Sequence, residues 1–222
     1  MSIYKLTYFN ACGLAELSRW CFAYGKIPFI DERITIEKWP QLKKELTSRG
    51  LAGNVPILTV DSHQLQESLA IARYIAKIAG LVPKDPLEAA VADACVDSLT
   101  GIGAQFRMMI RNGKPLIEFI PKTIDPLGPE FTEQRQRMEG EFGQNVIHPV
   151  LRRMELQLQD KKWLTSHGVS WADLYTCQQF EYKRRFFPDL LDGYPSVQTL
   201  VDQVRNIDSI KKWISTRPHT NM

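Results

Sequence analysis

The stretch NVPILTVDSHQLQESLAIARYIAKIAGL, residues 54 to 81, contains two short apolar segments, a turn and a periodic apolar run. Pro56 opens the first segment, where a missing N–H does not interrupt a sheet ladder. The Asp-Ser-His sequence predicts a hairpin between strands 56–61 and 64–66. The 3.6-residue spacing that follows predicts a helix over 67–79, ended by Gly80. This stretch therefore forms an antiparallel edge of a sheet and a helix that leaves it.

Glu67 and Ser68 stand where this helix begins. The first turn of a helix has unpaired backbone N–H groups and the positive end of the helix dipole. A proline before an edge strand and a Glu-Ser pair at a helix start would together suit a site that grips a small charged peptide.

The residues before this stretch alternate between strands and helices. Ile3 to Phe9 predicts a buried strand, Ala15 to Gly25 a helix and IPFIDERIT (27–35) a second strand. Trp39-Pro40 then opens a short helix, with the proline in its permitted first turn. Two strands joined by a helix should be parallel with a right-handed crossover. Residues 1–80 thus form a small α/β domain with the order β-α-β-α-β-β-α and a mixed sheet.

The remainder, residues 81–222, shows no convincing strand and is predicted to be an all-α domain. One long helix is expected over 87–111, a proline-rich loop over 112–129 and a second long helix over 131–159 that Pro149 should kink. Three shorter helices follow. In VSWADL (169–174), Ser170 and Asp173 have the spacing of a capping box, and the flanking apolar residues that of a hydrophobic staple.

Composition excludes several classes of function. A net charge of +3 from 28 basic and 25 acidic residues implies neither nucleic acid nor an anionic membrane as a partner. The basic-aromatic stretch Tyr182 to Phe187 lies in a helical pattern, so its Lys and Arg are expected on a solvated face. Four scattered cysteines and four scattered histidines suggest no disulfide framework and no metal site. With no apolar run long enough to span a bilayer, a cytoplasmic protein is expected.

The motifs, taken in order, make the chain similar to the cytosolic glutathione S-transferases, and within them to the sigma class of invertebrates. The resemblance rests on YKLTYFN (4–10), LAE (14–16), ERI (32–34), W-P-x-x-K (39–43), N-V-P-I-L (54–58), ESLAIARY-x-A (67–76), SWADL (170–174) and IKKW-x-x-TRP (210–218). It implies a thioredoxin-like glutathione-binding domain over 1–80. It also implies a helical domain over 81–222 that carries the electrophile pocket and the contacts of a homodimer.

In this resemblance Tyr8 is the catalytic residue, and its hydroxyl donates to the sulfur of glutathione. A free thiol with a pKa near 8.5 is only a few per cent thiolate at pH 7. One charge-assisted hydrogen bond contributes about 1.5–3 kcal/mol, which lowers the pKa of the thiol by roughly one to two units. From the residues alone, Tyr8 could equally be a core tyrosine of an aromatic strand.

The remaining site residues form a clamp around the tripeptide. Trp39 and Lys43 share a helix face, and the resemblance places both at the glycyl carboxylate. It assigns Asn54 and a cis Val55-Pro56 peptide to the cysteinyl backbone, which pairs there like an added strand. The γ-glutamyl group is met by Glu67 and Ser68, and by Asp97 from the neighbouring subunit. Without the resemblance, Trp39 and Lys43 would be a half-buried aromatic and a solvated lysine, and Asp97 a surface acid.

The sequence departs from the family at positions 12 and 14, which commonly hold arginine but here hold Cys12 and Leu14. These arginines would help to polarise the tyrosine. Cys12 has the spacing from Ala15-Glu16 that the reactive cysteine has in omega-class thiol transferases, and a helix N-terminus can depress a thiol pKa. The proline that follows the cysteine in those relatives is replaced by Gly13.

The sequence therefore predicts a detoxifying transferase that joins the sulfur of glutathione, its co-substrate, to small hydrophobic electrophiles without a metal. Prostaglandin H2 to D2 isomerisation and peroxide reduction are possible variants within the class. Two alternatives are a thiol transferase that uses Cys12 and a non-catalytic ligand-binding or structural member. The electrophile pocket is expected between Tyr8, Phe9 and Leu14 on one side and the first long helix, around Phe106 and Met109, on the other.

Overall fold

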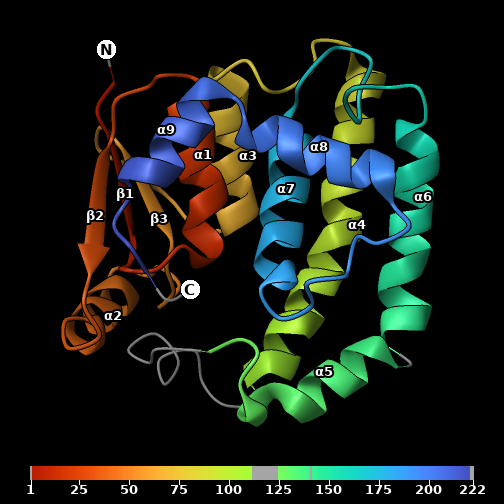
Figure 1. The fold of residues 1–222 in the computed structure, drawn as a ribbon. Helices are drawn as coiled ribbons and strands as arrows, with labels where there is room; N and C mark the ends of the chain where they lie inside the picture. The colour runs from red at the N-terminus through yellow and green to blue at the C-terminus, as the bar shows by residue number, and fades with distance from the viewer. Residues whose placement is uncertain (1, 112–124, 141, 221–222) are drawn as a thin grey trace.

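The computed structural model describes residues 2–111, 125–140 and 142–220. Figure 1 shows an N-terminal sheet with its helices beside a larger helical half. The N-terminal elements are β1 (Tyr4–Phe9), α1 (Glu16–Tyr24), β2 (Ile30–Ile34), α2 (Trp39–Ser48), β3 (Ile57–Val60), β4 (His63–Leu65) and α3 (Ser68–Ile78). The later helices are α4 (Pro86–Arg111), α5 (Thr132–Glu139), α6 (His148–Leu158), α7 (Trp171–Arg184), α8 (Pro195–Arg205) and α9 (Asp208–Thr216).

The four strands form one mixed sheet in the order β2-β1-β3-β4. β1 and β2 are parallel, as the helix between them requires, and β3 and β4 form the antiparallel hairpin. β1 pairs antiparallel with β3, and its last four residues are buried. The predicted order, pairing and edge hairpin are therefore confirmed. The fold is that of a thioredoxin-like domain followed by a helical domain.

The two halves meet where α1, α3 and α7 lie side by side (Figure 1). Residues buried in this region come from both halves, including Trp20 on α1, Ile71 on α3 and Trp171 on α7. The backbone N–H of Trp171 also donates to the carbonyl of Leu81, in the connection that follows α3. Because one continuous core crosses the boundary, the position of α7 relative to β1 is set by packing.

The capping box at the start of α7 is confirmed. Asp173 accepts from the backbone N–H and the hydroxyl of Ser170, both at 2.7 Å, and from the N–H of Leu164 at 2.9 Å. Burial raises the pKa of Asp173 to about 6, although these hydrogen bonds oppose the shift. The cap is therefore a buried anchor that also ties the preceding loop to α7.

The single long helix predicted over 131–159 is wrong. α5 ends at Glu139, and the backbone of the next residue, Gly140, leaves the helical region at φ −79°, ψ −137°. A π-helix (Gly143–Ile147) then leads into α6, and Pro149 lies in the first turn of α6, where its missing N–H costs nothing. The proline accordingly starts a helix rather than kinking one. Of the predicted loop 112–129, residues 112–124 lie outside the described residues.

The expectation that the Lys and Arg of Tyr182 to Phe187 face solvent is wrong for Lys183, whereas Arg185 is exposed as expected. Lys183 is 1% exposed and lies over the rings of Phe106 and Phe180, with Nζ 5.4 and 5.9 Å from their centroids. Its ammonium donates to the backbone and side-chain oxygens of Gln179, at 3.2 and 2.8 Å. Burial, together with the nearby charge of Arg107, lowers the pKa of Lys183 to about 7. Lys183 lies on the side of α7 that packs against apolar residues of the core, so its position is buried although its neighbour Arg184 is partly exposed.

The burial of Lys183 leads to a prediction about the pH dependence of the free energy of unfolding. A lysine whose pKa falls from 10.5 to about 7 in the folded state destabilises the fold fully below pH 7. The penalty disappears as the pH rises toward 10.5. Lys183→Met should therefore raise the free energy of unfolding by about 1–4 kcal/mol at pH 7, as replacement of buried charges does.

Urea unfolding at pH 7 and pH 10, followed by circular dichroism, measures this difference. Lys161→Met, a lysine substitution at an exposed position, is the control for loss of a charge alone. A Lys183→Met protein that is less stable than wild type at pH 7, or equally stabilised at both pH values, would contradict the prediction.

Candidate active site

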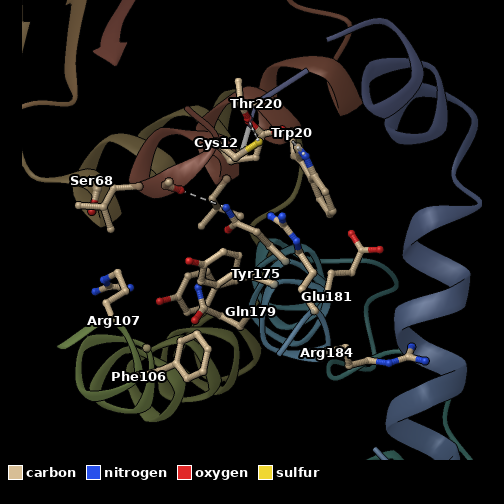
Figure 2. A pocket seen from close by; sticks show the side chains of 18 of the residues that line it. Cys12, Trp20, Ser68, Phe106, Arg107, Tyr175, Gln179, Glu181, Arg184 and Thr220 are labelled. Atoms are coloured by element: carbon tan, nitrogen blue, oxygen red, sulfur yellow. Dashed lines mark hydrogen bonds between the residues drawn. The ribbon is translucent and has the colours of Figure 1, made fainter. Parts of the chain in front are cut away.

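A cavity of about 690 Å³ opens between the two halves of the molecule. Figure 2 shows Ser68 and Cys12 on its N-terminal side, with Phe106 and Arg107 from α4 and Tyr175 and Gln179 from α7 on the opposite side. Its walls mix aromatic, aliphatic and cationic side chains. The lining includes Tyr8, Cys12, Gly13, Leu14, Glu16, Trp20, Ser68, Gly103, Phe106, Arg107, Arg111, Tyr175, Gln178, Gln179, Glu181, Tyr182, Arg184, Arg185, Arg205, Arg217 and Thr220.

Tyr8, at the end of β1, places its hydroxyl at the floor of this cavity. The hydroxyl accepts a hydrogen bond from the backbone N–H of Leu14 at 3.2 Å. A Cβ atom on Gly13 would lie 2.6 Å from the same oxygen, and Gly13 has a positive φ of 41°. Glycine is therefore required at position 13 to leave room for the Tyr8 hydroxyl. Since that oxygen already accepts from Leu14, its own proton remains available to a ligand.

The protonation state of Tyr8 suits a hydrogen-bond donor. Burial raises the pKa of Tyr8, and this outweighs the hydrogen bond from Leu14 and the charges of Arg19 and Arg107. The Arg19 guanidinium carbon lies 5.9 Å from the centroid of the Tyr8 ring. Although positions 12 and 14 hold no arginine, two cations from α1 and α4 act on this tyrosine. Tyr8 is thus a neutral donor at pH 7, not a base.

The loop beneath Tyr8 is held by the carboxylate of Glu16, which is 1% exposed. Glu16 accepts from the indole N–H groups of Trp20 and Trp213 at 3.0 and 2.9 Å, and it pairs with Arg19 and Arg217. Burial favours the neutral acid, but the two guanidinium charges and the Trp213 N–H prevail and lower the pKa of Glu16. One anion therefore joins α1 to α9 and to the C-terminal segment.

Cys12 lies against that C-terminal segment, with its Sγ 3.3 Å from the hydroxyl oxygen of Thr220. Figure 2 shows the two side chains pointing toward each other at the edge of the cavity. Burial and the negative charge of Glu16 raise the pKa of the Cys12 thiol. The helix that follows, Gly13–Ala15, is a single 3₁₀ turn. The hypothesis that a helix N-terminus depresses the pKa of this thiol is therefore not supported, and the alternative of an unreactive loop thiol is favoured.

Trp39 and Lys43 share one face at the start of α2, as predicted. The Trp39 ring packs edge-on against Phe9, with 5.3 Å between centroids, and is half-buried. Lys43 is exposed, and its aliphatic stem lies over Gly53, where a Cβ would approach the Lys43 Cγ to 3.0 Å. Both nitrogens are without a hydrogen-bond partner within the described ranges, so an indole N–H and an ammonium are free for an anion.

The 52–56 loop next to Lys43 is shaped by Gln66, which the sequence analysis did not single out. The Gln66 side chain bonds to the N–H and C=O of Ala52 at 3.0 and 2.7 Å, and to the backbone and side-chain oxygens of Asn54. The Val55-Pro56 peptide is cis, as predicted. Neither backbone polar group of Val55 pairs with another described residue. Gln66 could have been inferred from sequence only as a polar residue after a strand.

Glu67 and Ser68 occupy the predicted positions at the start of α3. Glu67 is exposed and has a positive φ of 71°, a conformation that costs about 1–3 kcal/mol outside glycine and that clusters at ligand clamps. Ser68 is the first residue of α3 and lines the cavity. The structure thus gathers Tyr8, Ser68 and the α3 N-terminus around one end of the cavity.

Three residues of the sequence analysis lie elsewhere. Asp97 is exposed on α4 and does not line the cavity. Phe9 and Met109, expected in the electrophile pocket, do not line it either: Phe9 is buried between Tyr8 and Trp39, and Met109 packs against the core. Successive residues on β1 point to opposite faces, so Tyr8 and Phe9 cannot both face the cavity.

The structure adds residues that sequence reasoning missed. Gln178 on α7 donates to the carbonyl of Gly13 at 3.4 Å and so connects the helical half to the loop under Tyr8. Arg107 on α4 and Gln179 on α7 line the wall opposite Ser68 (Figure 2). Nothing in a helical pattern distinguishes a cavity-lining arginine from a solvated one, because both occur at the same spacing.

Within the ranges that the structure describes, no group of three or more His, Cys, Asp or Glu side chains is arranged to hold a metal ion. In the same ranges, no helix combines the length and the apolar character needed to cross a membrane. The four cysteines are all free thiols.

Comparison with known proteins now identifies the family. Residues 4–77 match the glutathione S-transferase N-terminal domain, and residues 122–217 match the glutathione S-transferase C-terminal domain. A curated relative, hematopoietic prostaglandin D synthase of Gallus gallus, is 34% identical over 99% of both chains. Glutathione S-transferase S1 of Drosophila melanogaster is 31% identical over 99% of this chain and 80% of its own. The chain belongs to the glutathione S-transferase family.

A solved structure supports the same assignment. A monomeric glutathione S-transferase of the hookworm Necator americanus, Na-GST-3, superposes with a TM-score of 0.83. It is 28% identical, and the match covers 99% of this chain and all of the other. The architecture of both halves is therefore that of this family.

The raised pKa of Cys12 leads to a prediction about its rate of alkylation. Its raised pKa means that the thiol is protonated at pH 7 and should react slowly with iodoacetamide. We expect alkylation of the Cys12 peptide, followed by mass spectrometry, to be slower than that of free glutathione at pH 7 and to accelerate only above pH 9. Cys12→Ser identifies the signal. Fast modification with a midpoint at or below pH 7 would show a reactive thiolate instead.

Proposed function

We propose that the chain is a sigma-class glutathione S-transferase in which Tyr8 activates the thiol of glutathione for attack on small electrophiles. The observation that carries this is the Tyr8 hydroxyl itself. Tyr8 lines the cavity, and its hydroxyl remains protonated because burial raises its pKa and accepts from Leu14, so that its own proton is left for a ligand. A donor of this kind stabilises a thiolate without exchanging a proton in the reaction.

The polar groups around Tyr8 fit the tripeptide. Glutathione carries a carboxylate at each end and an ammonium at one. The unpaired Trp39 N–H and Lys43 ammonium suit the glycyl carboxylate. The unpaired backbone groups of Val55, held by Asn54 and Gln66, suit the cysteinyl backbone, and Pro56 fixes their direction. Ser68 and the α3 N-terminus suit the γ-glutamyl carboxylate.

Glu67 supports the same orientation. Its exposed carboxylate, beside Ser68, can accept from the α-ammonium of glutathione. Its positive φ turns the backbone at the point where the ligand would meet the helix. We therefore assign glutathione to residues 1–80, and the electrophile to the cavity wall supplied by residues 81–222.

The chemistry requires little else. The bound thiolate attacks the electrophilic carbon, a C–S bond forms, and the leaving group departs with its electron pair. Tyr8 donates to the sulfur in the ground state and the Arg107 and Arg19 charges favour an anion nearby. The proton of the thiol is released to solvent. No step needs a metal, and a cytoplasmic location with reduced cysteines follows from the same proposal.

A second candidate is isomerisation of prostaglandin H2 to D2 in the same site. It is favoured by the name of the chicken relative, a hematopoietic prostaglandin D synthase, which matches over the whole chain. In both reactions the thiolate of glutathione attacks, here on a peroxide oxygen rather than on carbon. An S–O bond forms as the O–O bond breaks and its other oxygen takes the electron pair and a proton. Loss of the proton on the carbon that bears the sulfur-bound oxygen then forms the ketone and releases the thiolate, so no external oxidant or reductant is consumed. Two observations disfavour the thiol transferase alternative. The pKa of the Cys12 thiol is raised, and Gly13 is explained by the room that the Tyr8 hydroxyl needs.

We further propose that the protein acts as a homodimer. Asp97 is exposed on α4 and lies outside the cavity of its own chain, so it can reach glutathione only in a partner subunit. Tyr74 and Ile78, one turn apart on α3, form an exposed apolar pair at 36% and 41% exposure. The hookworm relative is described as monomeric, which makes the assembly a direct test of the role of Asp97.

Tyr8→Phe should lower turnover with 1-chloro-2,4-dinitrobenzene by roughly ten- to a hundredfold, the equivalent of 1.5–3 kcal/mol of thiolate stabilisation. The pKa of bound glutathione, followed by ultraviolet titration of its thiolate, should rise by about one to two units in the same variant. Cys12→Ser is the matched control and should retain wild-type turnover. Unchanged turnover and an unshifted thiol pKa in Tyr8→Phe would end the proposed mechanism.

Light scattering at micromolar concentration should give a particle of twice the 25.5 kDa chain mass. Glutathione affinity should fall in Asp97→Asn, because the partner's γ-glutamyl ammonium would lose its carboxylate. A monomer that binds glutathione with wild-type affinity after Asp97→Asn would remove Asp97 from the site.

A further inference from the structure

The described lining of the cavity carries an excess of positive charge. Among the described residues, six arginines line it, two on α4 (107 and 111), two at the end of α7 (184 and 185), one on α8 (205) and one after α9 (217), against two carboxylates, Glu16 and Glu181. Each carboxylate is already paired, Glu16 with Arg217 and Glu181 with Arg205, the latter at 2.8 Å. Within residues 2–111, 125–140 and 142–220, no carboxylate pairs with Arg107 or Arg111. A cavity of this kind is suited to an anion.

Gln179 supplies a directed donor beside Arg107. Its side-chain oxygen accepts from the Lys183 ammonium at 2.8 Å. Since an ammonium can only donate, the oxygen of the amide is fixed on that side, and the NH₂ group is fixed on the other. This NH₂ group has no partner among the described residues. Lys183 therefore fixes the orientation of the Gln179 amide, and the unpaired NH₂ group of this amide is a donor in the cavity wall.

Gly103 lies beside both the Gln179 amide, at its oxygen end, and the Arg107 guanidinium. A Cβ at this position would lie 2.7 Å from the Gln179 side-chain oxygen and 3.2 Å from an Arg107 terminal nitrogen. Both groups thus lie over the same point of α4, in space that any side chain at position 103 would fill. Figure 2 shows Arg107 and Gln179 beside Phe106, on the wall that faces Ser68.

The arrangement of this wall lowers the stability of the fold, because it buries the ammonium of Lys183. The ammonium is 1% exposed and bonds within its own helix to Gln179 alone. Burying a cation that holds one amide in place is unfavourable for stability. Such an arrangement is consistent with a polar site that a ligand completes.

We propose that Arg107 and Gln179 form a subsite for the carboxylate of the electrophile, so that the preferred substrates are amphipathic organic acids. The acid would pair with the planar guanidinium and the amide N–H, and the apolar body would lie on Leu14, Phe106 and Tyr182. This rests on the proposed function in assuming that the cavity receives the electrophile. Guanidinium recognises carboxylate through two parallel hydrogen bonds, which favours this group over a diffuse anion.

Binding tests the subsite directly. The probes are 3,5-dinitrobenzoate and its methyl ester, which differ in charge and cannot react, titrated calorimetrically into the full chain with S-methylglutathione present. The acid should bind wild type about tenfold more tightly than the ester, as expected for one charge-assisted contact. The ratio should fall below about threefold in Arg107→Leu and in Gln179→Leu. Arg152→Gln, an exposed arginine on α6, should keep the wild-type ratio.

Equal binding of acid and ester to wild type, or equal weakening of both by Arg107→Leu, would overturn the subsite. If Arg107→Leu does not fold, Arg107→Lys replaces it. Lysine keeps the positive charge but cannot make the two parallel hydrogen bonds of a guanidinium, so the ratio of acid to ester affinity should be intermediate. Lys183→Met should also reduce the ratio, because the Gln179 amide loses its anchor while the cavity lining is unchanged.

Kinetics separate the subsite from the proposed function. 4-Chloro-3,5-dinitrobenzoate and its methyl ester are compared with glutathione, each rate divided by the uncatalysed rate. The thiolate displaces chloride in both, so wild type should favour the acid in kcat/KM by about tenfold. Conjugation of the ester without preference for the acid would refute the subsite and leave the transferase function. Tighter binding of the acid without conjugation of either would refute the transferase function and leave the subsite.

Discussion

The buried carboxylate of Glu16 is the interaction on which the rest of this structure depends. It receives four donors, from α1, α9 and the segment after α9. Removing one partner from a buried ion pair costs about 3–5 kcal/mol, because a charge is then left uncompensated. Glu16 also fixes the start of α1, and through Arg19 the carbonyl of Ala11, at 2.7 Å. The loop that shapes the space around Tyr8 is therefore held by electrostatics rather than by packing.

Two glycines in the cavity wall show which polar side chains occupy the space beside them. Gly13 is needed because the Tyr8 hydroxyl occupies the volume of its missing side chain. Gly103 has the same relation to Gln179 on the opposite wall. In both places the absence of a side chain on glycine leaves room for a polar group in the cavity wall. On the Gly103 side, that polar group is bonded to the buried Lys183, whose pKa is lowered.

Much of the fold was predictable because local rules and tertiary packing agree. The hairpin turn at Asp61, the capping box at Ser170 and the periodicity of α4 each depend on a few adjacent residues. Two predictions from the sequence pattern were wrong, one on the burial of Lys183 and one on the helix over 131–159. Lys183 has the spacing of a surface residue, but α7 is surrounded by other helices, so its position is buried. The break between α5 and α6 lies at Gly140 rather than at Pro149, because a proline in a first turn is compatible with a helix.

The sequence by itself determined the order of elements, the cis-prone Val55-Pro56 junction, the Glu-Ser pair at the α3 N-terminus and the tyrosine at the end of β1. These depend on backbone preferences and on neighbours within a few residues. Only the tertiary structure decided that the Cys12 thiol has a raised pKa, since the carboxylate and the buried surroundings responsible come from the folded loop. It also decided that Arg107 and Gln179, 72 positions apart in the sequence, meet over Gly103. Charges and cavities arise from side chains that distant segments bring together, and no local pattern encodes that distance.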